Sequence, residues 1–298
     1  MWFIFALLTA LCWGAADLFY KKGSEESDKM SHIQITIMVG FVMGVHAICL
    51  LIFTGAVFRP MELIKYLPVS ACYIVSMMIG YFGLRYIELS IASPIQNTSG
   101  ALTALLCFIF FAQALSGLTI AGMIIVTVGI VALAVIESHE ERRVRLPFSP
   151  QKYKKGVLVL IFPLLYCVFD ALGTFADAVY LDELALISEE DALLAYEFTF
   201  LLVAVLLLLY MTCIKKQKFV IRKQGNRTIA AVLETAGQFF YVYAMSGKAI
   251  VAAPLIATYS IFSVILLRIF CKEKLTLVKY LMIAIVLVGI AVLGLAEA

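Results

Sequence analysis

Three apolar stretches of this sequence each carry polar and aromatic side chains at helical spacing. The stripes are Thr9, Trp13, Asp17 and Tyr20; Tyr166, Asp170, Thr174 and Asp177; and Glu234, Gln238, Tyr241 and Met245. Residues three and four apart share a helix face, so each stripe predicts a polar face with an acid beside an aromatic ring. A carboxylate at the centre of a membrane helix costs about 2.5–3.5 kcal/mol on insertion scales and tends to face a cavity or a partner. Asp17, Asp170 and Glu234 are therefore candidates to contact a polar or cationic substrate or to take up protons.

Aromatic rings near these acids suit the same ligand class, because the face of a ring attracts organic cations. Trp13, Tyr81, Tyr241 and Tyr259 are the candidates. Asp17 and three further ionisable residues also have simpler explanations. Asp17 lies four residues before Lys21 and pairs with it in the alternative interpretation. The others are Asp177 as a solvated residue at the mouth, Glu197 in a salt bridge or packing role, and His46 as a packed core histidine away from other polar residues.

Two further apolar stretches begin with a proline followed by polar residues. Asn97 and Thr98 follow Pro94, and Thr258 and Tyr259 follow Pro254. A proline near a helix start leaves neighbouring carbonyls free, and the helix dipole there favours anionic or polar groups. These four residues are predicted to bind substrate, with helix capping and interhelical hydrogen bonding as the alternative. Arg85 and Glu88 are predicted to form a cytoplasmic gate or interface pair.

The composition shows which elements position these residues. Apolar residues make up 63% of the 298 and charged residues 14%, whereas soluble domains have about 45–50% and 25%. We predict an all-α integral membrane protein, because only helices satisfy their backbone economically inside a bilayer. The ten expected spans are 2–21, 33–54, 62–86, 91–112, 117–136, 156–181, 190–213, 228–246, 249–270 and 278–296. Seven scattered cysteines are interpreted as small buried hydrophobes, and neither a metal nor another cofactor is expected.

The distribution of basic residues predicts the orientation. Loops after the first, third, fifth, seventh and ninth spans carry 20 Lys and Arg residues, and the opposite side carries three: Arg59, Lys65 and Lys248. The positive-inside rule makes those odd-numbered loops cytoplasmic and places both termini outside.

An internal repeat divides the chain into two halves. Shifting the sequence by 160 residues places Pro94 to Leu133 on Pro254 to Leu293 without a gap, with twelve identities in forty positions. We predict five-helix repeats at 1–136 and 156–298, joined by a basic cytoplasmic linker at 137–155. An odd number of spans inverts the second repeat, and inverted repeats are typical of secondary transporters with a central binding site.

These features resemble the ten-helix, EamA-like branch of the drug/metabolite transporter superfamily. The resemblance rests on Trp13-Gly14, on the proline starts, and on the pattern Lys272-Glu273-Lys274-Leu275-Thr276 with Gly289-Ile290, which the first half changes to Gln113 at the acidic position. The resemblance implies a central cavity lined mainly by the first, third, fourth, sixth, eighth and ninth helices.

The expected function is secondary active transport of a small organic metabolite or drug across the cell membrane by alternating access. A cationic, zwitterionic or amino-acid-like substrate is favoured, with coupling to H⁺ as an option. The alternatives are an uncoupled facilitator or exchanger of the same fold and, less favoured, a membrane enzyme acting on a lipid-linked substrate. The expected partners are the substrate and the lipid bilayer, and no nucleic-acid partner is expected. The protein is predicted to be a monomer or homodimer. No GxxxxGK[ST] signature is present, which excludes primary transport by this chain alone.

Overall fold

The structure is a computed structural model that describes residues 1–23, 28, 30–55, 57–83, 95–96, 98–111, 115–144, 161–270 and 275–296. Over these residues it contains helices and connecting turns and no strand. The helices are α1 (Trp2–Gly23), α2 (Ser31–Thr54), α3 (Pro60–Gly83), α5 (Ser99–Phe110), α6 (Gly117–Val144), α7 (Ile161–Asp177), α8 (Glu189–Leu209), α9 (Gly225–Ile256), α10 (Tyr259–Phe270) and α11 (Leu277–Ala296). Short π-helices continue α7 (η2, Ala178–Glu183) and α8 (η3, Tyr210–Ile214), and a 3₁₀ turn (η4, Ile221–Lys223) precedes α9.

Seven helical segments of the described chain are long and apolar enough to cross a membrane. They are Trp2–Tyr20, Ser31–Thr54, Pro60–Gly83, Ile161–Glu183, Glu189–Ile214, Gly225–Ile256 and Leu277–Ala296. Shorter apolar helices occupy Ser99–Phe110, Gly117–Leu133 and Tyr259–Phe270. The helix α6 continues to Val144, beyond the predicted span end at residue 136.

The two spans expected to begin near a proline are interrupted by a turn at a threonine. In the second half, α9 passes through a non-helical residue, Lys248 (φ −163°, ψ 73°), and ends at Ile256, and α10 starts at Tyr259. The Thr258 hydroxyl donates to the Leu255 carbonyl at 2.6 Å. In the first half, the Thr98 hydroxyl donates to the Ile95 carbonyl at 2.7 Å, immediately before α5. The same local turn thus occurs at positions 160 residues apart.

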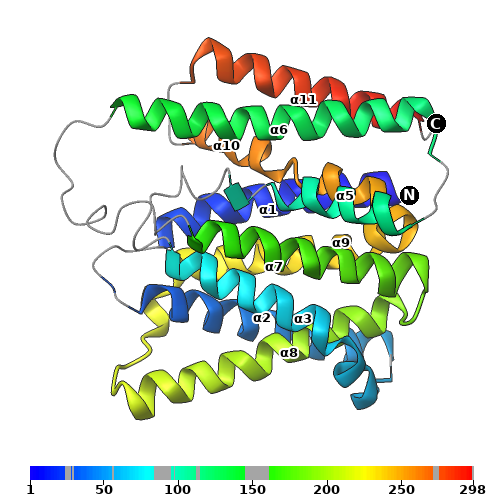
Figure 1. The fold of residues 1–298 in the computed structure, drawn as a ribbon. Helices are drawn as coiled ribbons and strands as arrows, with labels where there is room; N and C mark the ends of the chain where they lie inside the picture. The colour runs from blue at the N-terminus through cyan, green and yellow to red at the C-terminus, as the bar shows by residue number, and fades with distance from the viewer. Residues whose placement is uncertain are drawn as a thin grey trace.

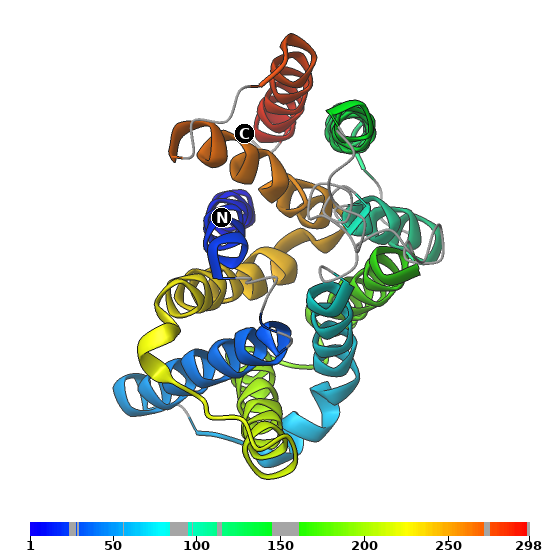
Figure 2. The same cartoon turned by 90° about the vertical axis from the view of Figure 1, so that its left-hand side faces the viewer.

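Helix packing follows one pattern in both halves of the chain. The helix α1 packs on α9 and α10, and α7 packs on α3 and α5; likewise α2 packs on α9, and α3 packs on α8. The pairs α6–α11 and α2–α8 lie at opposite edges of the bundle (Figures 1 and 2). The corresponding helices of the two halves are α1 and α7, α2 and α8, α3 and α9, α5 and α10, and α6 and α11. Replacing each helix by its counterpart turns every one of these contacts into a contact of the same set.

Glycines bring α6 and α11 into close contact. A Cβ on Gly129 would lie 2.3 Å from Val286 Cγ2, and a Cβ on Gly289 would lie 2.8 Å from Val126 Cγ2. Each contact maps onto the other by the 160-residue shift. Along α6 the residue number rises from Val126 to Gly129, while the residue contacted on α11 falls from Gly289 to Val286, so the two helices are antiparallel. Such small residues allow backbones to approach closely in a membrane protein.

Contacts along α9 distinguish the two ends of the bundle. Gly23, the last residue of α1, packs against Arg227 near the start of α9, and Trp2 packs against Gly247 near its far end. The Asp182 carboxylate in η2, just beyond α7, accepts a hydrogen bond from the Ala249 backbone N–H at 2.8 Å. The helices α1 and α7 therefore terminate at opposite ends, which we name the Arg227 end and the Ala249 end.

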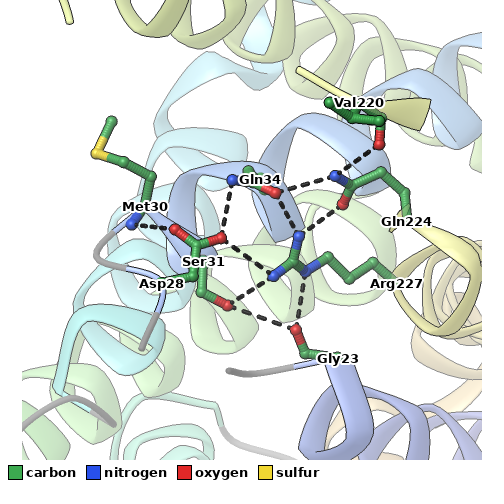
Figure 3. A network of polar contacts seen from close by, with 8 residues as sticks. All are labelled: Gly23, Asp28, Met30, Ser31, Gln34, Val220, Gln224 and Arg227. Carbon is green, nitrogen blue, oxygen red and sulfur yellow. Dashed lines mark hydrogen bonds and ion pairs between the residues drawn. The ribbon is translucent and has the colours of Figure 1, made fainter. Parts of the chain in front are cut away.

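A buried arginine organises the Arg227 end (Figure 3). Arg227 is only 4% exposed. Its guanidinium donates to the Gly23 carbonyl at 2.8 Å, to Gln224 Oε1 at 2.7 Å, to Ser31 Oγ at 3.1 Å and to Gln34 Oε1. Asp28 lies 3.6 Å away as its ionic partner. This network joins the end of α1 and the start of α2 to the start of α9.

Candidate functional site

Carboxylates from three helices converge inside the bundle. Asp17 lies on α1, Asp170 on α7 and Glu234 on α9. Glu234 is close enough to interact electrostatically with both other acids, and Tyr259 of α10 interacts with all three. The structure thus brings together the acids of the three sequence stripes.

Few polar groups satisfy these carboxylates. The Ser99 hydroxyl donates to Asp170 Oδ2 at 2.6 Å, and Ser263 of α10 lies beside the Asp17 carboxyl. Within the described part of the chain, no basic side chain forms an ion pair with Asp17, Asp170 or Glu234. Three acids therefore share one region without a described counter-charge, which favours a cation or protons in that region.

Aromatic side chains surround the acids. The Trp13 ring stacks on Tyr241 with centroids 5.3 Å apart and meets Tyr259 edge-on at 6.1 Å. Its indole Nε1 donates to the Glu234 backbone carbonyl at 3.3 Å. Gly237 makes room for this ring, because a Cβ there would lie 2.4 Å from Trp13 Cδ1.

Several side chains around the acids are part-exposed rather than fully buried. The following predicted site residues are part-exposed: Trp13, Asp17, Tyr81, Tyr166, Asp170, Glu234 and Tyr259. Tyr166 lies over Gly80, and Tyr81 packs its ring 5.5 Å from that of Tyr20. The part-exposed side chains of this region are thus carboxylates and the aromatic rings of Tyr and Trp.

Asp177 is completely buried, so its interpretation as a solvated residue at the mouth is wrong. The hydroxyls of Tyr73 and Tyr241 each donate to Oδ2 at 2.9 Å, and the Tyr66 hydroxyl donates to Oδ1. The Tyr73 and Tyr241 hydroxyl oxygens also lie 2.7 Å apart, and because each hydroxyl has a single proton, the two hydroxyls share their protons among these contacts. Tyr66 and Tyr73 were missed from the sequence, although their spacing of seven residues places them on one face of α3.

The remaining predicted residues have varied environments. Thr174 is buried; its hydroxyl donates to the Asp170 carbonyl at 3.0 Å, and its oxygen lies 2.9 Å from the Tyr73 hydroxyl oxygen. Gln238 is 2% exposed, and its Nε2 has no partner among the described residues. Thr98 and Thr258 bond to carbonyls of their own segments, as the capping alternative predicts. Asn97, Arg85 and Glu88 lie outside the described residues.

His46 contacts a buried carboxylate, so the prediction that it is remote from polar residues is wrong. Its Nδ1 lies 2.7 Å and 3.0 Å from the two Glu197 carboxylate oxygens, across the contact between α2 and α8. Glu197 is fully buried and its histidine partner is 33% exposed. The salt-bridge alternative for Glu197 is therefore correct. This pair lies apart from the three converging acids.

Comparison with known proteins agrees with this architecture. The model of the EamA-like transporter family matches residues 1–135 and again residues 157–295. A solved structure described only as "Crystal structure of protein" has a TM-score of 0.71 over 98% of this chain and 96% of that chain, at 14% sequence identity, and supports the fold alone. No curated protein matches the sequence. The two family matches, covering nearly all of the apolar helices, establish that the chain is a multi-pass membrane protein belonging to the EamA-like transporter family.

Proposed function

We propose that this protein is a ten-helix secondary transporter that moves a small organic cation or zwitterion by alternating access. Its ten spans form two inverted five-helix repeats, residues 1–136 and 156–298, connected by the basic linker 137–155. The single observation that carries the substrate class is the convergence of Asp17, Asp170 and Glu234 without a described counter-cation.

The packing supports the inverted repeats. The glycine–valine contacts between α6 and α11 are reciprocal, as in an interface with two-fold symmetry. Because these helices are antiparallel, such an axis lies across them, in the plane of the membrane. The opposite directions of α1 and α7 fit the same relation. In transporters with inverted repeats, the substrate site lies between the halves near the midplane.

The orientation proposal rests on the distribution of charge. With both termini outside the cell membrane, the Arg227 end is cytoplasmic and the Ala249 end faces outward. Arg222, Lys223 and the basic linker then lie on the cytoplasmic side, as the positive-inside rule requires. We place the protein in the cell membrane as a monomer or homodimer.

The chemistry of the acids supports proton exchange as the coupling mechanism. A carboxylate inside a membrane protein is costly when charged and unpaired. Bound protons neutralise the acids in the absence of substrate, and an organic cation replaces those protons while its ammonium group interacts with Trp13 and Tyr259. Substrate and protons then compete for the same carboxylates and cross the membrane in opposite directions.

A melting experiment on purified protein tests the substrate class. The ligands are tetraethylammonium, an aromatic primary amine, an amino acid, and neutral and anionic compounds of matched shape. Binding to the native state at 100 times Kd raises the free energy of unfolding by about 2.7 kcal/mol. We expect the cations to raise Tm, Asp170→Asn to abolish this increase, and Glu190→Gln, at an exposed position, to preserve it. Equal stabilisation by the neutral compounds contradicts the proposal.

A further inference from the structure

The 160-residue shift pairs two aspartates and two tyrosines outside the region where the repeat is evident in sequence. Asp17 corresponds to Asp177, and Tyr81 corresponds to Tyr241. Asp17 lies six residues before the end of α1 at Gly23, and Asp177 lies six residues before the end of η2 at Glu183, which continues α7; these two segments end at opposite ends of the bundle. Each half of the protein therefore has an aspartate and a tyrosine in related places.

The pair near the Ala249 end is closed. Asp177 is fully buried, Tyr241 is 2% exposed, and the Tyr241 hydroxyl donates to Asp177 Oδ2 at 2.9 Å. Tyr73 also bonds to both of these side chains.

The pair near the Arg227 end is open. Asp17 and Tyr81 are both part-exposed, and they are close enough to interact electrostatically. Over the described residues, no hydrogen bond joins the Tyr81 hydroxyl to the Asp17 carboxylate, and the Tyr81 ring packs against Tyr20 instead. In this one structure the Tyr241–Asp177 pair is thus hydrogen-bonded and buried, whereas the Tyr81–Asp17 pair is not hydrogen-bonded and is part-exposed.

The closed pair joins two groups of helices. We place α1, α2, α9 and α10 in the first group and α3, α5, α7 and α8 in the second. The helix α1 packs on α9 and α10, and α7 packs on α3 and α5, whereas the α2–α8 and α5–α9 contacts join the two groups. Tyr241 belongs to the first group, whereas Asp177, Tyr66 and Tyr73 belong to the second. The Tyr241 bonds to Asp177 and Tyr73 therefore connect the groups, and the Tyr66 bond to Asp177 lies within one of them.

We propose that Tyr241–Asp177 and Tyr81–Asp17 are reciprocal gates, an inference that rests on the proposed alternating-access function. This structure has the Tyr241–Asp177 gate closed. In the opposite state, Tyr241 leaves Asp177, the Ala249 end opens, and the Tyr81 hydroxyl donates to Asp17 to close the Arg227 end. Each aspartate is accessible to ligand only while its own gate is open, so Asp177 is a second carboxylate contact for the cation on the Ala249 side.

Spin-label distances between the helix groups test the gates without substrate. Labels at Glu190 and Lys248 report on the Ala249 end, and labels at Lys22 and Lys215 report on the Arg227 end; all four positions are exposed. Each pair is introduced as cysteines after replacement of the seven native cysteines. The protein is reconstituted in lipid nanodiscs.

Phenylalanine substitutions in the two gates are expected to shift the ratio of open to closed Ala249 ends in opposite directions. Tyr241→Phe keeps the ring on Trp13 but removes bonds to Asp177 and Tyr73, so the ratio of open to closed Ala249 ends increases about tenfold or more. Tyr81→Phe shifts the ratio the other way. Asp17→Asn weakens the Tyr81–Asp17 gate without changing an aromatic ring. It is expected to shift the ratio in the same direction as Tyr81→Phe.

Tyr66→Phe is the matched control, because it removes a bond to the same carboxylate within one helix group. We expect it to lower Tm without changing the distance distributions. Identical distributions for Tyr241→Phe and Tyr66→Phe, or shifts of Tyr241→Phe and Tyr81→Phe in one direction, overturn the gate proposal. Opposite shifts in a protein that moves no organic cation support the gates and refute the proposed substrate.

Discussion

Replacing Arg227 with methionine tests how much the buried network at the Arg227 end contributes to stability. Methionine keeps the apolar stem but removes every guanidinium donor to Gly23, Gln34, Gln224 and Ser31. It also removes the ionic partner of Asp28. The Asp28 carboxylate retains hydrogen bonds from the Met30 backbone N–H and from Gln34 Nε2, each at 2.9 Å.

The expected loss follows from these contacts. Hydrogen bonds to a charged group contribute about 1.5–3 kcal/mol each, but bonds that share one guanidinium are not additive. Breaking a buried ion pair by removing one partner costs about 3–5 kcal/mol. Because Asp28 keeps two donors, we expect Arg227→Met to lower the free energy of unfolding by about 3 kcal/mol, near the lower limit of that range.

Reversible unfolding of the purified protein in mixed micelles, with increasing denaturing detergent, measures this loss. Arg222→Met is the control, since Arg222 lies on the exposed 3₁₀ turn close to the network and exposed substitutions usually change stability by less than about 0.5 kcal/mol. A loss below about 1 kcal/mol for Arg227→Met, or equal losses for both variants, refutes the assignment of a stabilising role to this network.

Two further predictions concern helix contacts away from the site. Gly129→Ala and Gly289→Ala each introduce a Cβ that contacts the partner helix too closely, so both should lower the free energy of unfolding by about 1–3 kcal/mol, whereas Gly117→Ala, with open space around it, should not. A loss in only one of the two contradicts the reciprocal packing. His46→Leu leaves the buried Glu197 carboxylate unpaired and should lower the free energy of unfolding by about 3–5 kcal/mol, whereas Glu197→Gln, which retains a hydrogen-bonding group, should lower it less. Denaturant unfolding measures both losses. A smaller loss for His46→Leu than for Glu197→Gln refutes the pairing role of His46.

The sequence predicts the helical stripes well because periodicity is a local property. Asp17, Asp170 and Glu234 each lie on a helix face with aromatic neighbours, and the structure brings those faces together. Composition and charge pattern likewise predict apolar membrane-spanning helices. The threonine turns before α5 and α10 were not predicted, because hydropathy does not distinguish a continuous helix from one interrupted by a single turn.

The errors concern residues whose partners are distant in sequence. His46 has no polar neighbour within its own helix, and its partner Glu197 is 151 residues away. Asp177 lies close in sequence to the acidic residues after α7, which suggested exposure to solvent. Its tyrosine partners instead come from α3 and α9, 111, 104 and 64 residues away. Only the packing of helices from both halves reveals such contacts.

The central claim is that the three acids carry an organic cation across the membrane in exchange for protons. Proteoliposomes with an acidic interior provide the direct measurement, with uptake of the amine that gives the largest Tm increase recorded together with proton release. We predict uptake coupled to proton efflux, reduced about tenfold or more in Asp170→Asn and unchanged in Glu190→Gln. Uptake equal to that of empty liposomes, or full proton-coupled uptake by Asp170→Asn, would contradict the account.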